Sequence, residues 1–402
     1  MSGLSLLAPV SIGQRDALRA TLLGAARLPV YAELFSRSGI EESLIRAEPM
    51  RALARLPLFA GEMQARLTRE ALEQRRFDLG GVELSSGTGG TPKRRVLSEE
   101  DLALDAALLT RLLHLAGVRA GDRVTAIELS VTPLAVAFLE GCERLGVRES
   151  TALAWRPGAD LSSLHRLAPS VLIAPPSLLK LIAPLPSGLP LVIYNGDRLD
   201  GETAARLRGA GIGVRSLYGL TETSALGISC ATECGVHLSP EQALFELRSL
   251  DADHELIVTT LGYSMPLLRY PTGDRVRPVV GACSCGSSWP RVEVLGRLGA
   301  RFSLFEIELS VDELAAYLGL GDASLQVVLD DGLGGRVRMT LRPGTESRDR
   351  WRAMRRRLAT HPLLDYLVAA RLIQVQFRPL ESAVGRKLTP LVDRRGRAAD
   401  AG

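Results

Sequence analysis

Aromatic side chains and lysine are scarce in this sequence of 402 residues. Phe, Trp and Tyr together make up 4% of the chain, arginine far outnumbers lysine, and the formal net charge is only +4. Proteins that bind nucleic acid usually combine a strongly basic surface with aromatic side chains on which bases stack. The composition therefore argues against a nucleic-acid partner.

Long apolar segments are also missing. No apolar run approaches the roughly 20 residues of a membrane span, although 46% of the residues are hydrophobic and can bury a sizeable core. The stretch Met1–Arg15 holds a short apolar patch but lacks the basic start of a signal peptide. We therefore expect a cytoplasmic protein that does not contact a membrane.

Cysteine is present in a small, odd number, and four of the five cysteines lie late in the chain. In a cytosolic protein such a cluster favours metal binding or packing over disulfides. Cys234, His237, Cys283 and Cys285 supply three thiols and one imidazole, a set that suits tetrahedral zinc. Cys230 is a spare or an alternative to Cys234. The competing interpretation is buried free thiols, which pack as small hydrophobes.

A glycine-rich stretch follows the strand-like residues 82–84. It reads Ser85, Ser86, Gly87, Thr88, Gly89, Gly90, Thr91, Pro92 and Lys93. Three glycines within four residues allow the backbone to turn tightly and approach a ligand. Exposed N–H groups, hydroxyls and one ammonium offer donors to phosphate oxygens. The stretch predicts a phosphate-binding loop, whereas the alternative is an ordinary surface turn.

Short apolar strands alternate with helices between residues 123 and 218, with one helix expected over 133–145; this predicts βαβ units and a parallel sheet. Short strand-like runs follow within about 224–297 (244–247, 256–260, 267–270 and 276–280), and a compact α+β segment occupies 298–402. We expect an α/β protein: a large N-terminal domain (1–297) with a parallel sheet and a small β-rich subdomain, and a small, mobile α+β C-terminal domain (298–402).

Four short motifs follow one another along the chain in an order that is informative about the family. They are the glycine loop, Tyr218-Gly219-Leu220-Thr221-Glu222, Tyr270-Pro271-Thr272-Gly273-Asp274, and Gly296-Arg297. This series resembles the adenylate-forming ligases, and within them the phenylacetate–coenzyme A ligase branch. Consistency across independent features carries the resemblance, because each motif alone is a common loop or cap pattern. It covers residues 15–297 well and the remainder weakly.

The resemblance implies an ATP-dependent enzyme that makes an acyl- or aryl-adenylate, releases pyrophosphate and transfers the acyl group. The acceptor would be coenzyme A, a carrier-protein thiol or an amine. Residues 85–93 would hold the β- and γ-phosphates, Thr221 the α-phosphate and Glu222 a Mg²⁺ ion. Asp274 would accept the ribose hydroxyls, supported by Arg297. The adenine would lie against Asn195, Gly196, Asp197, Tyr218 and Gly219, and some relatives carry zinc at positions like those of the cysteines here.

The C-terminal part departs from the pattern of the family. The linker aspartate is replaced by Gly299, and the catalytic lysine of the family falls at Arg386, which leaves Lys387 as the expected catalytic cation. These departures favour a specialised biosynthetic enzyme with a small carboxylic acid substrate; a homodimer and the identity of the acid are left open. The alternative is an adenylation-fold protein that binds nucleotide or partners but has impaired catalysis.

Overall fold

The structure is a computed structural model. It describes residues 4–59, 61–74, 78–84, 94–128, 132–154, 162–181, 185–196, 199, 201–250, 252–299, 301–305, 307–320, 325–332, 336–343, 348–361, 364–380 and 391–395. The glycine loop 85–93, Asp197, Arg386 and Lys387 lie outside these ranges. In the described part of the chain, no helix has the length and apolar character needed to cross a membrane.

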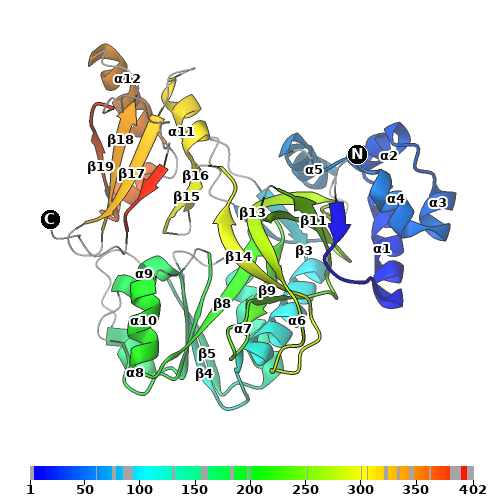
Figure 1. Ribbon diagram of the computed structural model, residues 1–402, viewed down its shortest axis with the longest axis horizontal. Helices are drawn as coiled ribbons and strands as arrows, with labels where there is room; N and C mark the ends of the chain where they lie inside the picture. The colour runs from blue at the N-terminus through cyan, green and yellow to red at the C-terminus, as the bar shows by residue number, and fades with distance from the viewer. Residues whose placement is uncertain are drawn as a thin grey trace.

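A layer of helices forms the N-terminal part and packs on one side of the large sheet (Figure 1). Ser11 begins the first helix with a capping box to Gln14. Two further helices begin at Pro29 and Pro49, where the missing proline N–H costs nothing. The helices are α1 (Ile12–Ala25), α2 (Pro29–Arg37), α3 (Glu42–Ala47), α4 (Pro49–Arg55) and α5 (Gly61–Gln74).

The predicted parallel sheet is present. Its strands run in the order β8-β7-β6-β4-β5 with helices between them, and the helix predicted over Pro133–Leu145 is confirmed. Ser98 caps α6 and forms a capping box with Asp101. The elements are α6 (Glu99–Ala116), β4 (Arg123–Glu128), α7 (Pro133–Leu145), β5 (Glu149–Ala154), α8 (Ser162–Leu167), β6 (Val171–Ala174), α9 (Pro176–Leu181), β7 (Leu191–Tyr194), α10 (Gly201–Gly209) and β8 (Gly213–Leu220).

The β-rich stretch continues this sheet through the antiparallel pair β8–β9. Twelve strands follow in the order β1-β11-β12-β13-β14-β10-β9-β8-β7-β6-β4-β5. The strand predicted over 267–270 was wrong: Arg269 has φ +54°, and the strand begins at Tyr270. The added strands are β1 (Leu4–Leu6), β9 (Ser224–Ser229), β10 (Val236–Leu238), β11 (Ala243–Ser249), β12 (His254–Thr260), β13 (Tyr270–Val279) and β14 (Arg291–Arg297).

A separate hairpin frames the glycine loop. Its strands β2 (Leu79–Leu84) and β3 (Arg94–Ser98) are antiparallel, and Leu84 and Arg94 are partners in the register. The hairpin packs on α6 and α7. The ends of the predicted phosphate loop are therefore held together by a ladder next to the main sheet.

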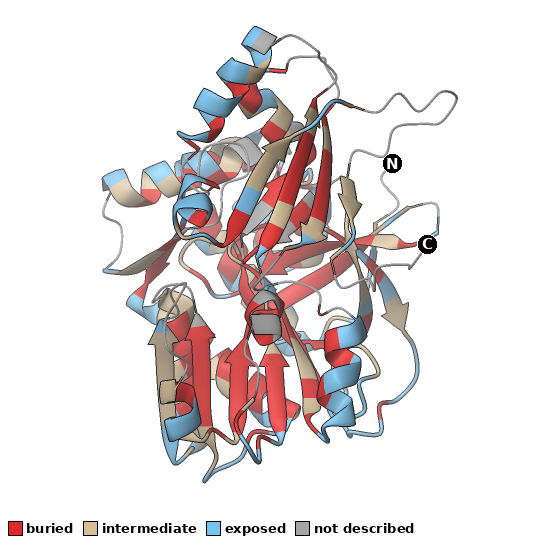
Figure 2. Cartoon of the chain, turned by 90° about the vertical axis from the view of Figure 1, so that its left-hand side faces the viewer, coloured by how far each residue is buried: buried red, intermediate tan, exposed pale blue. Residues whose placement is uncertain are grey.

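The C-terminal segment forms a four-stranded sheet in the order β19-β18-β17-β20, with helices beside it. Its core joins that of the parallel sheet in one hydrophobic cluster, and the buried strands of both are seen in Figure 2. The elements are β15 (Arg301–Leu304), β16 (Ile307–Ser310), α11 (Val311–Leu318), β17 (Leu325–Asp331), β18 (Val337–Pro343), α12 (Arg348–Leu358), α13 (Leu364–Ala369), β19 (Ile373–Phe377) and β20 (Leu391–Asp393).

Candidate nucleotide-binding edge and metal site

Two of the predicted motifs lie against each other and exchange hydrogen bonds. Tyr218 near the end of β8 donates from its hydroxyl to Asp274 Oδ2 at 2.6 Å. Tyr270 at the start of β13 donates to Glu222 Oε1 at 3.0 Å. Each motif thus contributes a tyrosine to the carboxylate of the other. We call Tyr218, Glu222, Tyr270, Asp274 and Arg297 the nucleotide edge.

The backbone at this edge restricts which residue types its positions can accommodate. A side chain at Gly219 would collide with the backbone of Ser224 across the β8–β9 pair. Ser224 itself has φ +65°, which is uncommon for a residue other than glycine. Gly273, at φ +74°, allows the turn before Asp274. The two loops are therefore shaped by local backbone requirements as well as by their side chains.

Asp274 is buried and is held from two sides. Its Oδ1 lies 3.2 Å from Arg297 Nη1, and Arg297 also donates to the carbonyl of Thr272 at 2.6 Å. Burial, and then the negative charge of Asp274, raise the pKa of Tyr218 well above its ordinary value. Tyr218 therefore stays protonated and donates to the carboxylate.

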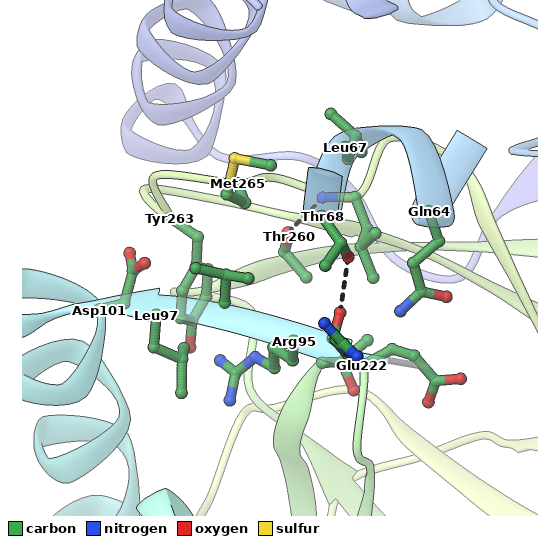
Figure 3. Close-up of a pocket in the computed structure, with 14 residues that line it drawn as sticks. Gln64, Leu67, Thr68, Arg95, Leu97, Asp101, Glu222, Thr260, Tyr263 and Met265 are labelled. Atoms are coloured by element: carbon green, nitrogen blue, oxygen red, sulfur yellow. Dashed lines mark hydrogen bonds between the residues drawn. The ribbon is translucent and has the colours of Figure 1, made fainter. Parts of the chain in front are cut away.

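Glu222 lies beside a small cavity between α5, β3 and the segment 260–267. The cavity has a volume of about 30 Å³, enough for about two water molecules or one end of a ligand. Gln64, Thr68 and Leu67 of α5 line it opposite Glu222 (Figure 3). The buried Oε1 of Gln64 has no hydrogen-bond partner among the described residues. Sequence reasoning missed this wall, because α5 carries no recognisable motif.

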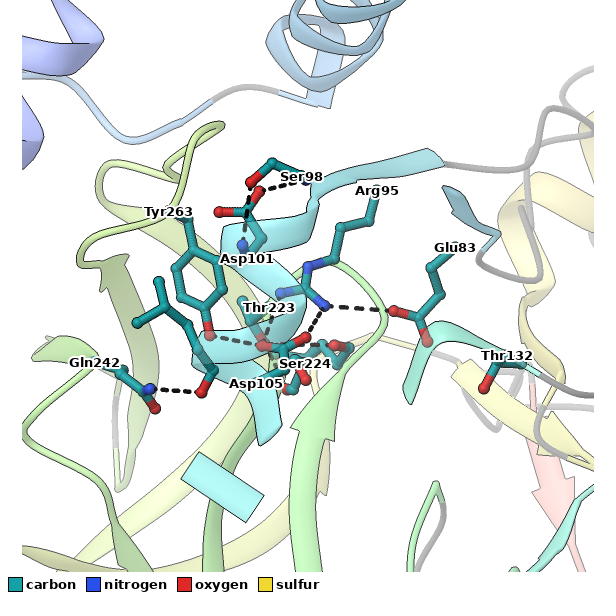
Figure 4. A network of polar contacts seen from close by, with 12 residues as sticks. Glu83, Arg95, Ser98, Asp101, Asp105, Thr132, Thr223, Ser224, Gln242 and Tyr263 are labelled. Atoms are coloured by element: carbon teal, nitrogen blue, oxygen red, sulfur yellow. Dashed lines mark hydrogen bonds and ion pairs between the residues drawn. The ribbon is translucent and has the colours of Figure 1, made fainter. Parts of the chain in front are cut away.

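A buried charge network supports the hairpin that frames the glycine loop (Figure 4). Arg95 of β3 binds both oxygens of Asp105 of α6, at 2.8 and 3.1 Å, and lies 3.5 Å from Glu83 of β2. Tyr263 donates to Asp105 at 2.7 Å. Burial is the largest single effect and lowers the pKa of Arg95, but the charge of Asp105, its hydrogen bonds and the charges of Tyr263 and Glu83 together outweigh it, so that the pKa is raised. The network joins β2, β3, α6 and the 260–267 segment into one support.

The predicted adenine contacts lie at the end of the neighbouring strand. Asn195 and Gly196 follow β7, which pairs in parallel with β8. The carboxyl ends of parallel strands meet at one edge of the sheet, so these residues lie on the same edge as Tyr218 and Gly219. The buried Oδ1 of Asn195 has no hydrogen-bond partner within the described ranges.

Thiols and an imidazole from three segments meet at the other end of β9. The ligand atoms of Cys230, Cys234, His237 and Cys283 all lie within 4.8 Å of one another. Cys285 Sγ lies 3.5 Å from His237 Nε2. We call these five residues the cysteine cluster. Hydrogen bonds from Thr232 and then Cys234 lower the pKa of Cys283 to about 5, which favours its thiolate.

The spacing within the cluster suits zinc. Zn–S bonds of about 2.3 Å and Zn–N bonds of about 2.0–2.1 Å place tetrahedral ligands about 3.8 Å apart for two sulfurs, and about 3.6 Å apart for sulfur and nitrogen. The Cys230–Cys283 distance of 3.6 Å and the Cys285–His237 distance of 3.5 Å are close to these values. The 3.0 Å between Cys234 and Cys283 is shorter. The four donors that lie mutually within 4.8 Å fit one zinc ion; they include Cys230 in place of the predicted Cys285, which lies beside His237 as a fifth donor.

A parallel sheet extended by antiparallel strands, with carboxylates on loops at one edge and a small α+β unit after them, defines the fold of an adenylate-forming ligase. Residues 36–250 match the family model of the AMP-binding enzymes. This is more than half of the chain, and the chain belongs to that family. The resemblance found in the sequence is thereby confirmed.

The relatives include two phenylacetate–coenzyme A ligases. The chain is 26% identical to that of Thermus thermophilus over 297 residues, covering 67% of this chain and 66% of the relative. It is 24% identical to that of Aromatoleum evansii over 306 residues, covering 67% and 69%. The matched part thus spans about two thirds of each relative.

A solved 2-hydroxyisobutyryl-CoA ligase has the same fold. In its thioesterification state, with its acyl-AMP and CoA, it superposes with a TM-score of 0.73 at 17% identity, covering 95% of this chain and 89% of the ligase. In its postadenylation state the same ligase gives a TM-score of 0.59 at 17% identity, covering 94% and 88%.

Proposed function

We propose that the protein activates a small carboxylic acid with ATP, forming an acyl- or aryl-adenylate and pyrophosphate. The observation that carries this proposal is the nucleotide edge, where two carboxylates on facing loops are each fixed by a tyrosine. The carboxylate of Asp274, next to a turn, can accept hydrogen bonds from ribose hydroxyls. The carboxylate of Glu222, beside a cavity, offers the oxygen ligands that a hard cation prefers. Family membership supports the same reaction.

The reaction would use the edge to position ATP. Asp274, oriented by Tyr218 and Arg297, would accept hydrogen bonds from the ribose hydroxyls. Asn195, Gly196, Asp197, Tyr218 and Gly219 would lie against the adenine. Thr221 would bind the α-phosphate, and residues 85–93 the β- and γ-phosphates. The glycine-loop residues are Ser85, Ser86, Gly87, Thr88, Gly89, Gly90, Thr91 and Lys93.

A carboxylate oxygen of the substrate attacks the α-phosphorus, and the bond from this phosphorus to the bridging oxygen breaks as pyrophosphate leaves with the electron pair. Such transfer depends on positioning and charge neutralisation. Glu222 would hold Mg²⁺, which when bound offsets the charge on the phosphates. Lys387 would stabilise charge that develops between the carboxylate and the α-phosphate.

The second step would transfer the acyl group to coenzyme A, a carrier-protein thiol or an amine, releasing AMP. Gly299 has φ +78°, a conformation that glycine adopts without strain, so it can serve as the hinge in place of aspartate. In this proposal the adenylation domain comprises residues 1–297, and the small C-terminal domain that would rotate between the two steps comprises residues 298–402.

The cysteine cluster would hold one structural zinc ion. Four protein ligands close such a site to water, so the metal would pin the β9–β10 turn to the β13–β14 connection. The spacing supports His237 and Cys283 with two of Cys230, Cys234 and Cys285. Metal analysis of the purified protein should give about one zinc per chain; a value well below this would contradict the proposal.

The proposal places the enzyme in the cytoplasm, in a biosynthetic role, acting on a small acid as a monomer or homodimer. The test is exchange of labelled pyrophosphate into ATP over a panel of aryl, aliphatic and amino acids, with Mg²⁺ present or chelated. At least one acid should support exchange that depends on Mg²⁺. Exchange with none would favour a nucleotide-binding protein that has lost catalysis.

A further inference from the structure

We propose that Tyr270 is a positioning residue that orients Glu222 for the divalent cation, and that the N-terminal helices hold Tyr270 in place through Phe59. The inference rests on the proposed function, because that function assigns the cation to Glu222. It goes further in making the helical layer, which is far from the motifs in sequence, part of the cation site.

The hydroxyl of Tyr270 is the contact that fixes the carboxylate. It donates to Glu222 Oε1 at 3.0 Å from a side chain that is almost fully buried. Glu222 stands in the loop after β8, where a glutamate has several rotamers with similar energy. A hydrogen bond from a rigid phenol selects one of these rotamers, as partners in the second layer do around metal ligands.

The ring of Tyr270 is in turn held by the helical layer. Phe59 packs edge-on against it, with ring centroids 5.7 Å apart and an interplanar angle of 60°. The backbone N–H of Phe59 donates to the carbonyl of Arg269 at 3.0 Å. Phe59 therefore contacts the ring of Tyr270 and is also hydrogen-bonded to Arg269, the residue that precedes Tyr270 in the chain.

Arg269 links the segment that holds Phe59 and Tyr270 both to the end of α4 and to strand β11. Its guanidinium donates to the carbonyl of Leu56 at 2.6 Å and to that of Ala54 at 3.1 Å. It also binds both oxygens of Glu246 on β11, each at 3.0 Å. A buried bidentate pair of this kind has little freedom. Tyr270 therefore cannot shift unless the end of α4 shifts with it.

Tyr218 provides the internal comparison. It makes the same kind of hydrogen bond, to Asp274, but this carboxylate is assigned to the ribose. Removing the hydroxyl of Tyr218 should therefore affect nucleotide binding, and removing that of Tyr270 should affect cation binding. A general loss of structure would change both together.

The experiment measures binding of Mn²⁺ by electron paramagnetic resonance in the presence of a non-hydrolysable ATP analogue. Tyr270→Phe keeps the ring and should weaken Mn²⁺ binding about tenfold, in line with the loss of a partner of a metal ligand. Tyr218→Phe should weaken binding of the analogue and leave the Mn²⁺ constant, measured at saturating analogue, as in the wild type.

Tyr317→Phe is the control. It removes a tyrosine hydroxyl that lies 3.4 Å from the hydroxyl of Thr360 in the C-terminal unit. It should leave both constants unchanged. The proposal is overturned if Tyr270→Phe binds Mn²⁺ like the wild type, or if Tyr317→Phe loses as much.

The relay from the helices is tested with Phe59→Leu against Phe35→Leu. Both phenylalanines are buried in the same cluster; the ring of Phe59 packs against Tyr270, whereas the ring of Phe35 packs against Tyr31. Phe59→Leu should weaken Mn²⁺ binding severalfold, and Phe35→Leu should not. Equal effects would remove the helices from the proposal.

These measurements separate the inference from the proposed function. A wild-type protein that binds Mn²⁺ with the analogue, yet exchanges pyrophosphate with no acid, would overturn the proposed function and leave the positioning role standing. A wild-type protein that exchanges pyrophosphate, together with a Tyr270→Phe variant that binds Mn²⁺ normally, would overturn only the inference.

Discussion

The nucleotide edge and the cysteine cluster are parts of one sheet, but their side chains are held in different ways. At the edge each carboxylate has its own tyrosine, and Asp274 also has Arg297. At the cluster five donors gather where a tetrahedral zinc takes four. A single substitution at the nucleotide edge should therefore remove the binding role of one carboxylate. The cysteine cluster should still bind zinc after the loss of its fifth donor.

The largest expected effect comes from the charge network that supports the hairpin around the glycine loop. Arg95→Ala leaves the buried Asp105 and Glu83 without their cation, and breaking such a pair costs about 3–5 kcal/mol. The free energy of unfolding from urea titration should fall by this amount. The control Arg66→Ala breaks an ion pair with Glu33 that is about half exposed on each side, and its effect on the free energy of unfolding should be much smaller, because solvent screens the pair. Similar losses in both variants would mean that the network is not a support.

The next effect is at the edge itself. Asp274→Ala removes the proposed ribose acceptor and leaves Arg297 and Tyr218 without this partner. We expect kcat/KM for ATP to fall about a hundredfold, or about 2.7 kcal/mol, in pyrophosphate exchange.

Asp253→Ala serves as its control, since Asp253 pairs with Arg275 and Arg277 on the same strand as Asp274 but away from the edge. A loss of equal size there would contradict a specific role for Asp274.

A smaller effect distinguishes the members of the cluster. Cys283 is close to both Cys230 and Cys234, so Cys283→Ser should reduce the zinc content markedly. Cys285→Ser leaves four other donors and should keep about one zinc, with affinity lower by about tenfold at most. Metal analysis after dialysis against a graded chelator measures both. Equal zinc loss in the two variants would show that no donor is spare.

The smallest effect concerns His361, which lies outside both the nucleotide edge and the cysteine cluster and affects the pH dependence of stability. Burial lowers the pKa of His361 below 6.5, and its neutral Nδ1 accepts a hydrogen bond from the N–H of Leu364. The unfolded chain then binds more protons between the folded pKa and about 6.5. Stability should be full above this range and fall as the pH decreases through it, by at most about 1.4 kcal/mol per pH unit.

His361→Gln should flatten the pH dependence of stability over this range, as measured by urea titration. Parallel curves for His361→Gln and the wild type would contradict the assignment to His361.

The sequence was sufficient for elements that carry their own signals. The helix from Pro133 has a threonine cap and ends before Gly146 in the left-handed conformation, and both signals are local. Proline is ambiguous in a sequence, because it can end a helix or begin one. Pro29 and Pro49 each begin a helix, since the first turn of a helix needs no N–H donor from its first residue.

The contacts within the site could not be predicted in the same way. The motifs named Tyr218, Glu222, Tyr270 and Asp274, but the exchange of hydrogen bonds between them depends on how two loops about 50 residues apart meet. Likewise, the sequence left Cys230 as an alternative to Cys234, and only the tertiary arrangement places both beside Cys283. The wall formed by Gln64 and Thr68 has no local signature at all.

The junction between the large sheet and the C-terminal unit has a thermodynamic consequence. The N–H of Leu298, next to Gly299, donates to the carbonyl of Gly273 at 2.6 Å, immediately before Asp274. The proposed hinge and the proposed ribose loop therefore share a hydrogen bond. If this hydrogen bond couples the two, nucleotide binding changes the preference between hinge orientations by a coupling free energy, and each orientation changes the affinity for nucleotide by the same amount.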